Sequence, residues 1–393
     1  MVKRWDFDRT IRCSSFVVPE GAGEYYFTVI SDKPGSFDEA VAELCEKYRY
    51  VTEYMGLSQR TLVFSRLYVG DIANHRGLLV KSELFRHIGH GVVSVIEQPP
   101  PAPGSLALFS YHLKKTAGDF QKEFSGWVRE PWCTEMVVKG DHYSMVWKSN
   151  LTQEGPPDPK QQTGRLFKSF SALLHRYNLN VRNNLVRTWM YVRDIDNNYA
   201  GMVEARKDFF HSQGLCSESR FVASTGIEGR SGVDGAVIAM DSLSLGNIDE
   251  EQIIRIEALE CLPRTISYGV TFERGLRLRF GDRSHLLISG TASINADGKV
   301  AYEGDVEKQT HKTIDNVEAL LRTQGATLND MAYVFCYMRN PVDYERVKEI
   351  VDARLPGNIP LVSVRAAVCR PAWLFEMEGT AIIADSSPFP AFI

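Results

Sequence analysis

The spacing of apolar residues alternates between two periods along the chain, and the alternation follows one order three times. Apolar residues three to four positions apart predict an amphipathic helix over residues 306–325, ending at Gly325. An almost wholly apolar run at 331–338 predicts a buried strand. With their neighbours they give the order strand, strand, helix, strand, helix, strand, strand, at 275–280, 285–294, 306–325, 331–338, 340–355, 360–369 and 373–383. This order favours a single mixed sheet with two helices on one face.

The central part of this order recurs twice earlier in the chain. Each copy has a helix, an apolar strand with a tyrosine near its end, a turn, a second helix and two more strands. The tyrosines, Tyr68, Tyr191 and Tyr337, lie roughly 130 residues apart, which is a typical domain size. The earlier helices are expected at 37–54 and 76–88, then at 165–177 and 200–214. We therefore expect an α+β protein of three tandem units, at 1–113, 114–246 and 247–393.

Composition excludes several classes of partner. The 45 basic and 49 acidic residues are interleaved, which gives no basic patch for nucleic acid. The first residues lack a long apolar segment, and no apolar run approaches the roughly 18 residues of a membrane span, so no membrane association is expected. Seven scattered cysteines favour free thiols and a cytoplasmic protein. His87 and His90 have no third ligand nearby in the sequence, so neither a metal nor another cofactor is expected.

The third unit resembles a known family in three segments, ISGTASI, GDVEKQTHKTIDNVEALL and FEMEGTAI. In these it is similar to the Rid family, also called YjgF or endoribonuclease L-PSP-like. The resemblance implies a chorismate-mutase-like fold that assembles as a homotrimer with ligand clefts between neighbouring subunits. Three such units in one chain imply an intramolecular pseudo-trimer, in which each unit completes its neighbour's cleft. Any higher oligomer is left open.

The Rid resemblance also assigns residues. The deaminating members of the family hold a substrate carboxylate with an arginine and use a glutamate of the last strand to handle a water. By position, Glu376 matches that glutamate, and Ser289 matches the serine of the family's cleft. The third unit has Val362 where the arginine is expected, whereas the second unit keeps an arginine, Arg220. This interpretation implies hydrolysis of a reactive imine or enamine.

A second resemblance is closer in its motifs. The segments FERG, ISGTASI, RTWMYVRDID and VCRPAWLFE are similar to segments of the chorismatases, Rid-fold enzymes that cleave pyruvate from chorismate. Carried over by position, Glu376 would be the general acid and Cys369 a wall residue. The residues expected to bind the substrate and its carboxylates are Arg187, Arg274, Arg206, Phe272 and Tyr191.

The chemistry of these residue types agrees with such a role. A dianion in a partly dry cleft favours arginine, whose planar fork binds carboxylates through two hydrogen bonds. Arg187 and Tyr191 share one strand face, because side chains alternate with period two. Glu376 stands in an apolar stretch, where desolvation raises a carboxyl pKa toward the range of a general acid. The structural alternatives are arginines paired with local carboxylates, a solvent-facing glutamate and a small core cysteine.

Three functions therefore stay open. The first is a chorismatase-like enzyme that acts on a small anionic carboxylate. The second is an imine deaminase, and the third is a module that binds a metabolite without catalysis.

Overall fold

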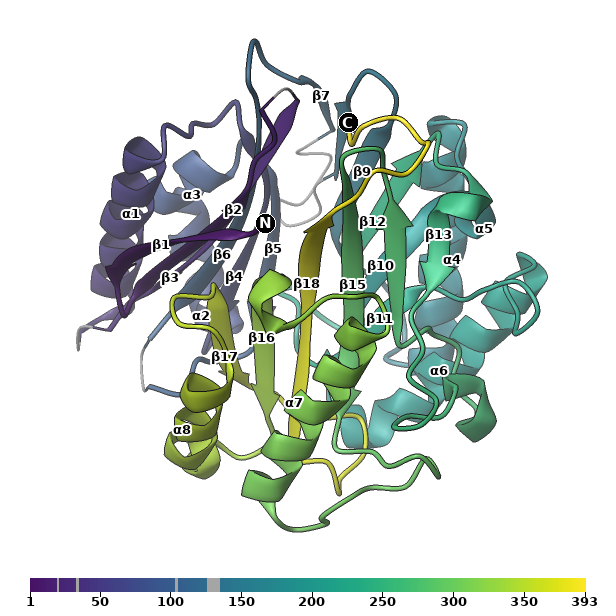
Figure 1. Ribbon diagram of the computed structural model, residues 1–393. Helices are drawn as coiled ribbons and strands as arrows, with labels where there is room; N and C mark the ends of the chain where they lie inside the picture. Colours follow the sequence, from purple (N-terminus) through teal and green to yellow (C-terminus); the bar gives the residue numbers. More distant parts are fainter. Residues whose placement is uncertain (20, 33–34, 103–104, 126–134) are drawn as a thin grey trace.

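The computed structural model describes residues 1–393 except for 20, 33–34, 103–104 and 126–134, and it contains three six-stranded mixed sheets (Figure 1). The first sheet consists of β1 (Lys3–Asp8), β2 (Ile11–Phe16), β3 (Ala22–Ile30), β4 (Leu62–Val69), β5 (Val92–Glu97) and β6 (Ala107–Lys115). The second consists of β7 (Gln121–Ser125), β8 (Glu135–Lys139), β9 (Ser144–Leu151), β10 (Leu185–Val192), β11 (Ala223–Glu228) and β12 (Ile238–Gly246). The third consists of β13 (Ile253–Arg255), β14 (Gly275–Arg279), β15 (Arg283–Ala292), β16 (Met331–Met338), β17 (Leu361–Arg365) and β18 (Phe375–Ala384).

All three sheets have the same topology. Their orders are β1-β2-β3-β6-β4-β5, β7-β8-β9-β12-β10-β11 and β13-β14-β15-β18-β16-β17. In each sheet the fourth strand in sequence pairs antiparallel with the sixth and parallel with the fifth. This confirms the predicted α+β fold of three like units. In the third unit the prediction missed β13, which precedes the predicted hairpin, and in the first two units it named none of the three strands before the first helix.

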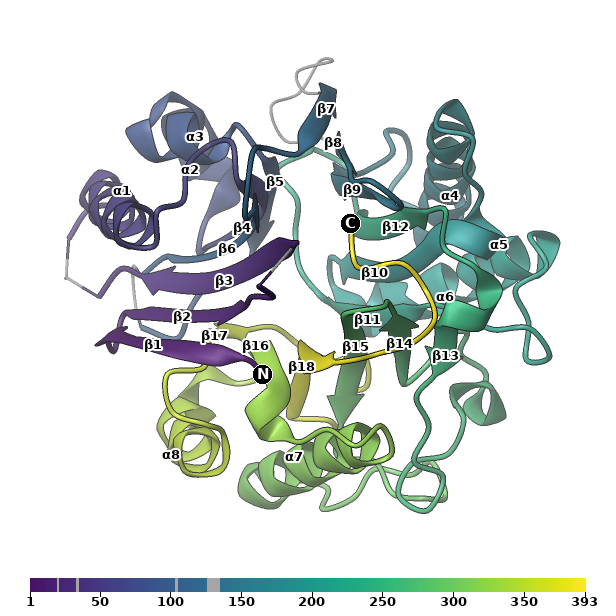
Figure 2. The same cartoon turned by 45° about the horizontal axis from the view of Figure 1, so that its top comes forward.

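The helices cover the outer faces of the sheets, and the inner faces are turned toward one another (Figure 2). They are α1 (Phe37–Tyr54), α2 (Ile72–Lys81), α3 (Glu83–Ile88), α4 (Pro159–Arg176), α5 (Val181–Asn184), α6 (Ile195–Ser212), α7 (Val306–Arg322) and α8 (Tyr344–Arg354). Short 3-10 turns lie at Glu250–Gln252, Thr265–Tyr268, Leu328–Asp330 and Pro341–Asp343.

Three helix predictions need correction. The helix α6 begins at Ile195, within the turn that was expected before residue 200. The single helix expected at 76–88 is two helices, because Ser82 has an extended backbone (ψ 158°) and its side chain caps α3 by accepting from the Phe85 amide. The helix α4 begins at Pro159, ahead of the expected start at 165. Asp158 caps this helix, and proline suits the first helical position, where no backbone donor is required.

The three repeat tyrosines lie on the inner faces of the sheets, where the units meet. Tyr68, Tyr191 and Tyr337 are each at most 1% exposed. The Tyr191 hydroxyl donates to Asp241 at 3.3 Å, and the Tyr337 hydroxyl donates to Glu378 at 2.5 Å. The repeated tyrosine of the sequence thus marks the strand position that faces the common centre.

Buried ion pairs cross all three junctions between neighbouring units. Arg66 of β4 bonds Asp241 of β12, with 2.9 Å between Nη2 and Oδ2 and both side chains 0% exposed. Arg187 of β10 bonds Glu378 of β18, and both are almost fully buried. At the remaining junction, Arg283 of β15 bonds Glu24 of β3, with 2.7 Å between Nη1 and Oε1. Aromatic rings also meet there: Phe109 of β6 lies 4.7 Å from Tyr333 and 5.0 Å from Phe335 of β16, between ring centroids. Each junction therefore has its own cross-unit contact.

No helix within the described ranges has both the length and the apolarity that are needed to cross a bilayer. The six cysteines of the described part of the chain are free thiols, as the sequence predicts. The seventh, Cys133, lies outside the described residues.

We predict that Asp241→Asn lowers the free energy of unfolding by about 3–5 kcal/mol, because the change leaves the buried Arg66 guanidinium without a counter-charge. Urea denaturation followed by circular dichroism measures the effect. The exposed Asp208→Asn is the matched control. An Asp241→Asn variant as stable as this control would show that the pair does not hold the first and second units together.

Candidate active site

The candidate active site lies at the seam between the second and third sheets. Backbone and side-chain bonds close this seam: the Ser224 amide donates to Ser289 Oγ at 2.9 Å, and the Gly290 amide donates to Thr225 Oγ1 at 2.9 Å. Beside these strands lies a cavity. It is lined by Tyr199, Arg206, Ser224, Gly226, Tyr268, Val270, Phe272, Arg274, Gly290, Ala292, Ile294, Cys369, Arg370, Trp373 and Glu376.

Glu376 is the one carboxylic acid among the lining residues. It lies on β18 opposite Tyr337 and is 4% exposed. Burial, and then the nearby Glu378 carboxylate, raise its pKa to about 8, against the opposing effect of Arg187 and Arg274. Its Oε1 has no hydrogen-bond partner among the described residues. Glu376 therefore keeps its proton at neutral pH and has it available for transfer.

A glycine makes room for this carboxyl group. A Cβ atom on Gly290 would lie 2.3 Å from Glu376 Oε1 and 3.0 Å from Thr225 Cγ2. Any side chain at this position would displace the acid or the neighbouring strand. The bare backbone of β15 thus lets the carboxyl group lie directly against it.

Arg206 is a buried cation without a carboxylate partner in the described structure. It comes from α6 and is 1% exposed. Its Nη1 donates to Ser224 Oγ at 3.4 Å, whereas Nε and Nη2 have no partner among the described residues. Burial lowers its pKa from the ordinary value. Burying a guanidinium without a counter-charge lowers the stability of the folded protein, and an anion bound in the cavity would offset this loss.

Two further arginines lie on aromatic rings of the cavity wall. Arg274 lies 5.3 Å from the centroid of Tyr268 and donates to the Pro263 carbonyl at 3.2 Å. Arg370 lies 5.2 Å from the centroid of Tyr268 and 5.0 Å from that of Trp373. Because Glu376 is neutral, the lining has cations and no anion. The cavity is therefore suited to a small, negatively charged and partly planar molecule.

Residues 280–383 match the family described as Endoribonuclease L-PSP. A RutC family protein from Pyrococcus abyssi is 28% identical over 97 residues, which are 24% of this chain and 76% of that protein. The crystal structure of a chorismatase aligns with a TM-score of 0.59 at 18% identity, over 82% of this chain and 93% of its own. The match to the Endoribonuclease L-PSP family is confined to residues 280–383, and the chain has a chorismatase-like fold. A Rid protein of unknown function from Yersinia pestis aligns with 33% of the chain and 99% of its own length, at 24% identity and a TM-score of 0.29.

Five of the residues selected from the sequence line one cavity. They are Glu376, Arg274, Arg206, Cys369 and Phe272, and they come from the second and third units. Burial raises the pKa of the Cys369 thiol to about 12, so the cysteine is a neutral part of the wall.

Arg187 and Ser289 lie behind the cavity rather than on its lining. Arg187 pairs with Glu378 and donates to Thr225 Oγ1 at 2.9 Å. Ser289 donates to the Glu273 carbonyl at 2.6 Å. Both side chains join the second unit to the third. Arg187 also lines a separate cavity, together with Trp189 and Tyr333.

Tyr191 and Arg220 lie away from the cavity. Tyr191 is buried among the inner faces of the sheets, where it bonds Asp241. Arg220 donates to the backbone carbonyls of Leu185 at 3.1 Å and Phe221 at 3.2 Å. Its donors are occupied by the second unit's own backbone, and burial lowers its pKa to about 10.

Sequence reasoning missed several lining residues, of which Tyr199, Tyr268, Arg370 and Trp373 bear on the chemistry. Two features of the sequence could have indicated three of these residues. Arg370 and Trp373 stand between Cys369 and Glu376 in the VCRPAWLFE segment. Tyr199 precedes Arg206 by about two helical turns, so both residues share one face of α6.

The other two junctions lack the acid of this Rid-fold cleft. The residue of β6 opposite Tyr68 is Ala107, and the residue of β12 opposite Tyr191 is Ala239, whereas Glu376 lies opposite Tyr337. At the junction of the first and second units, the Gln98 side chain is 1% exposed and donates to the Glu228 carbonyl. The acid and the free arginine thus meet at the junction of the second and third units.

We predict that Glu376→Gln removes a pH dependence from the stability of the protein. Folded Glu376 keeps its proton to about pH 8, whereas an unfolded glutamate loses it near pH 4.5, so the folded state binds more protons between these values. Wild-type stability therefore falls, relative to the variant, as pH rises from about 5 to 8, by about 3–5 kcal/mol. Urea denaturation at several pH values, with the exposed Glu349→Gln as control, measures this. Parallel curves for wild type and Glu376→Gln would contradict the raised pKa.

Proposed function

We propose that the cavity between the second and third units acts on a small anionic carboxylate, in a reaction most like the chorismatase removal of pyruvate from chorismate. One observation carries the proposal: the neutral acid Glu376 shares its cavity with Arg206, a buried guanidinium with two unused donor groups among the described residues. A carboxylate would neutralise that arginine, and the acid would then be beside the bound molecule with its proton.

In the proposed reaction the arginines hold the substrate and Glu376 starts the chemistry. Arg206 and Arg274 bind carboxylate groups, and the rings of Tyr268 and Trp373 pack against the ring of the substrate. Glu376 gives its proton to the terminal methylene carbon of the enolpyruvyl ether, which leaves a cation at the ether carbon. Water adds there, and the resulting hemiketal breaks down to pyruvate and a ring alcohol. The proton released by the water returns to Glu376, so the net reaction consumes one water.

Positive charge behind the acid supports this role. Arg187 and Arg274 both lower the pKa of Glu376, so they stabilise the carboxylate that forms after proton transfer. Burial and Glu378 favour the protonated form before transfer. The proposal assigns Arg187 to positioning, because it bonds Glu378 rather than facing the cavity.

We also propose how the chain is organised. We place the units at 1–113, 114–246 and 247–393 and regard them as an intramolecular pseudo-trimer. The like sheets and the ion pairs between neighbouring units support that arrangement. Free thiols in the described part of the chain support a cytoplasmic location. The imine-hydrolysing alternative depends on Arg220, whose donors are bonded to backbone carbonyls outside the cavity.

We predict that the protein releases pyruvate from chorismate and that Glu376→Gln lowers kcat by roughly 10²–10⁴-fold, the usual contribution of a general acid. Coupling to lactate dehydrogenase measures the pyruvate. Glu349→Gln, an exposed change of the same kind, leaves the rate unaltered. Absence of pyruvate from the wild-type reaction would overturn the proposal, and full activity of Glu376→Gln would overturn the role of the acid.

We predict that Arg206→Lys raises KM by roughly 10–100-fold with a smaller effect on kcat. Lysine keeps the positive charge but loses the planar fork that bonds a carboxylate twice, and such charge-assisted bonds are worth about 1.5–3 kcal/mol. Steady-state kinetics measure both constants, with the exposed Arg193→Lys as control. An unchanged KM would show that Arg206 does not contact the substrate.

A further inference from the structure

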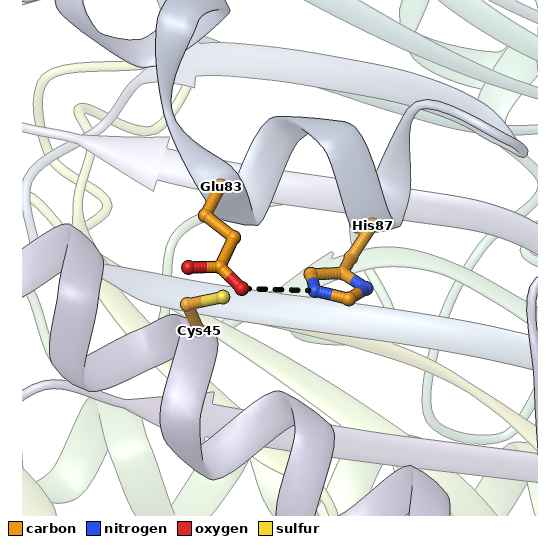
Figure 3. Close-up of side chains that lie close together, drawn as sticks. All are labelled: Cys45, Glu83 and His87. Atoms are coloured by element: carbon orange, nitrogen blue, oxygen red, sulfur yellow. Dashed lines mark ion pairs between the residues drawn. The ribbon is translucent and has the colours of Figure 1, made fainter.

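Three metal-ligating side chains meet among the outer helices of the first unit, apart from the candidate active site (Figure 3). Cys45 comes from α1, and Glu83 and His87 come from α3. One ligand atom from each residue, a sulfur, a carboxylate oxygen and a ring nitrogen, lies within 4.8 Å of the other two. Within this set, His87 Nε2 and Glu83 Oε1 are 3.6 Å apart.

The local structure explains why the three side chains converge. The extended backbone at Ser82 ends α2 and starts α3 in a new direction. Glu83 and His87 are four residues apart on α3, so they project from one face of this helix. Figure 3 shows that this face looks toward the Cys45 side chain of α1, which is only 5% exposed. The cluster thus has one buried ligand and two on its accessible side.

We propose that Cys45, Glu83 and His87 form a binding site for a divalent transition metal, with Zn²⁺ as the preferred ion. A thiolate, an imidazole and a carboxylate are the three kinds of side chain that zinc takes, whereas Ca²⁺ and Mg²⁺ take oxygen ligands. Two ligands of a tetrahedral zinc, with bonds of about 2.0–2.3 Å, lie roughly 3.3–3.7 Å apart. The separation of His87 and Glu83 is in this range, and side-chain rotation supplies the rest. Three protein ligands leave the fourth position to water.

Two other interpretations explain the cluster less well. A nucleophilic cysteine is usually partly exposed to its substrate, whereas Cys45 is only 5% exposed. A simple surface ion pair accounts for Glu83 and His87, but it is worth little and gives no role to the sulfur. Arg49 lies 3.6 Å from Glu83 Oε1, and it is the neighbour that a metal ion would displace from this carboxylate.

Sequence reasoning rejected a metal at this position, because His87 and His90 had no third ligand nearby. The third ligand is Cys45, which the packing of α1 against α3 supplies from far earlier in the chain. His90 is exposed and is not part of the cluster. A bound metal would link α1 to α3 and stabilise the first unit, independently of the reaction at Glu376.

Titration of the metal-free full-length protein with Co²⁺ tests the site. Cobalt replaces zinc in such sites and reports a bound thiolate by a sulfur-to-cobalt charge-transfer band in the near ultraviolet. We expect this band to saturate at one equivalent and to disappear when Zn²⁺ is added. Cys45→Ser abolishes the band, whereas Glu83→Gln and His87→Ala weaken affinity by at least roughly tenfold. His90→Ala, the matched control, binds as the wild type does.

Zn²⁺ also raises the Tm of the wild type and of His90→Ala, and it leaves the Tm of His87→Ala unchanged. Glu83 is 61% exposed in its side chain, so Glu83→Gln tests the ligand set without disturbing the core. The site is overturned if the wild type gives no charge-transfer band. It is also overturned if the band persists in Cys45→Ser, or if His90→Ala loses binding as His87→Ala does.

Discussion

The buried ion pair between Arg187 of the second unit and Glu378 of the third is the contact on which the candidate site depends. Neither charge can be left alone in the interior, so β10 and β18 have to stay together. Their contact brings β11 alongside β15, where Thr225 bonds the Gly290 amide. Because of this seam, a helix of one unit and the last strand of the next face a shared cavity.

The same pair shapes the surroundings of two neighbouring glutamates. Glu378 accepts hydrogen bonds from the Arg187 guanidinium, the Trp189 indole and the Tyr337 hydroxyl. Glu376, two residues earlier on β18, has burial and a negative neighbour, which favour its protonated form. The arginines of the cavity then have no negatively charged partner on the cavity wall, so a substrate carboxylate can provide the counter-charge.

The local pattern of apolar and polar residues predicted the order of the central elements of each unit, because amphipathic periodicity and helix capping depend on neighbouring residues. It missed short elements such as β13, whose three residues are too few for a period, and it misplaced the start of α4. For the site, motif positions led to Glu376, Arg274 and Arg206. Strand alternation put Arg187 and Tyr191 on one face, but it could not tell whether that face lines the cavity or meets the other sheets. Some contacts form only when distant segments pack together, such as those of Cys45 with α3 or of Arg220 with backbone carbonyls. The local sequence does not predict them.

The central claim is that Glu376 delivers a solvent-exchangeable proton to carbon. Running the reaction on chorismate in D₂O, with lactate dehydrogenase present to trap pyruvate as it forms, tests this directly. The account predicts one deuterium in the methyl group of the trapped lactate, because the acid exchanges its proton with solvent before each turnover. A methyl group without deuterium would mean that hydrogen comes from the substrate's own ring, and that result would contradict general-acid catalysis by Glu376.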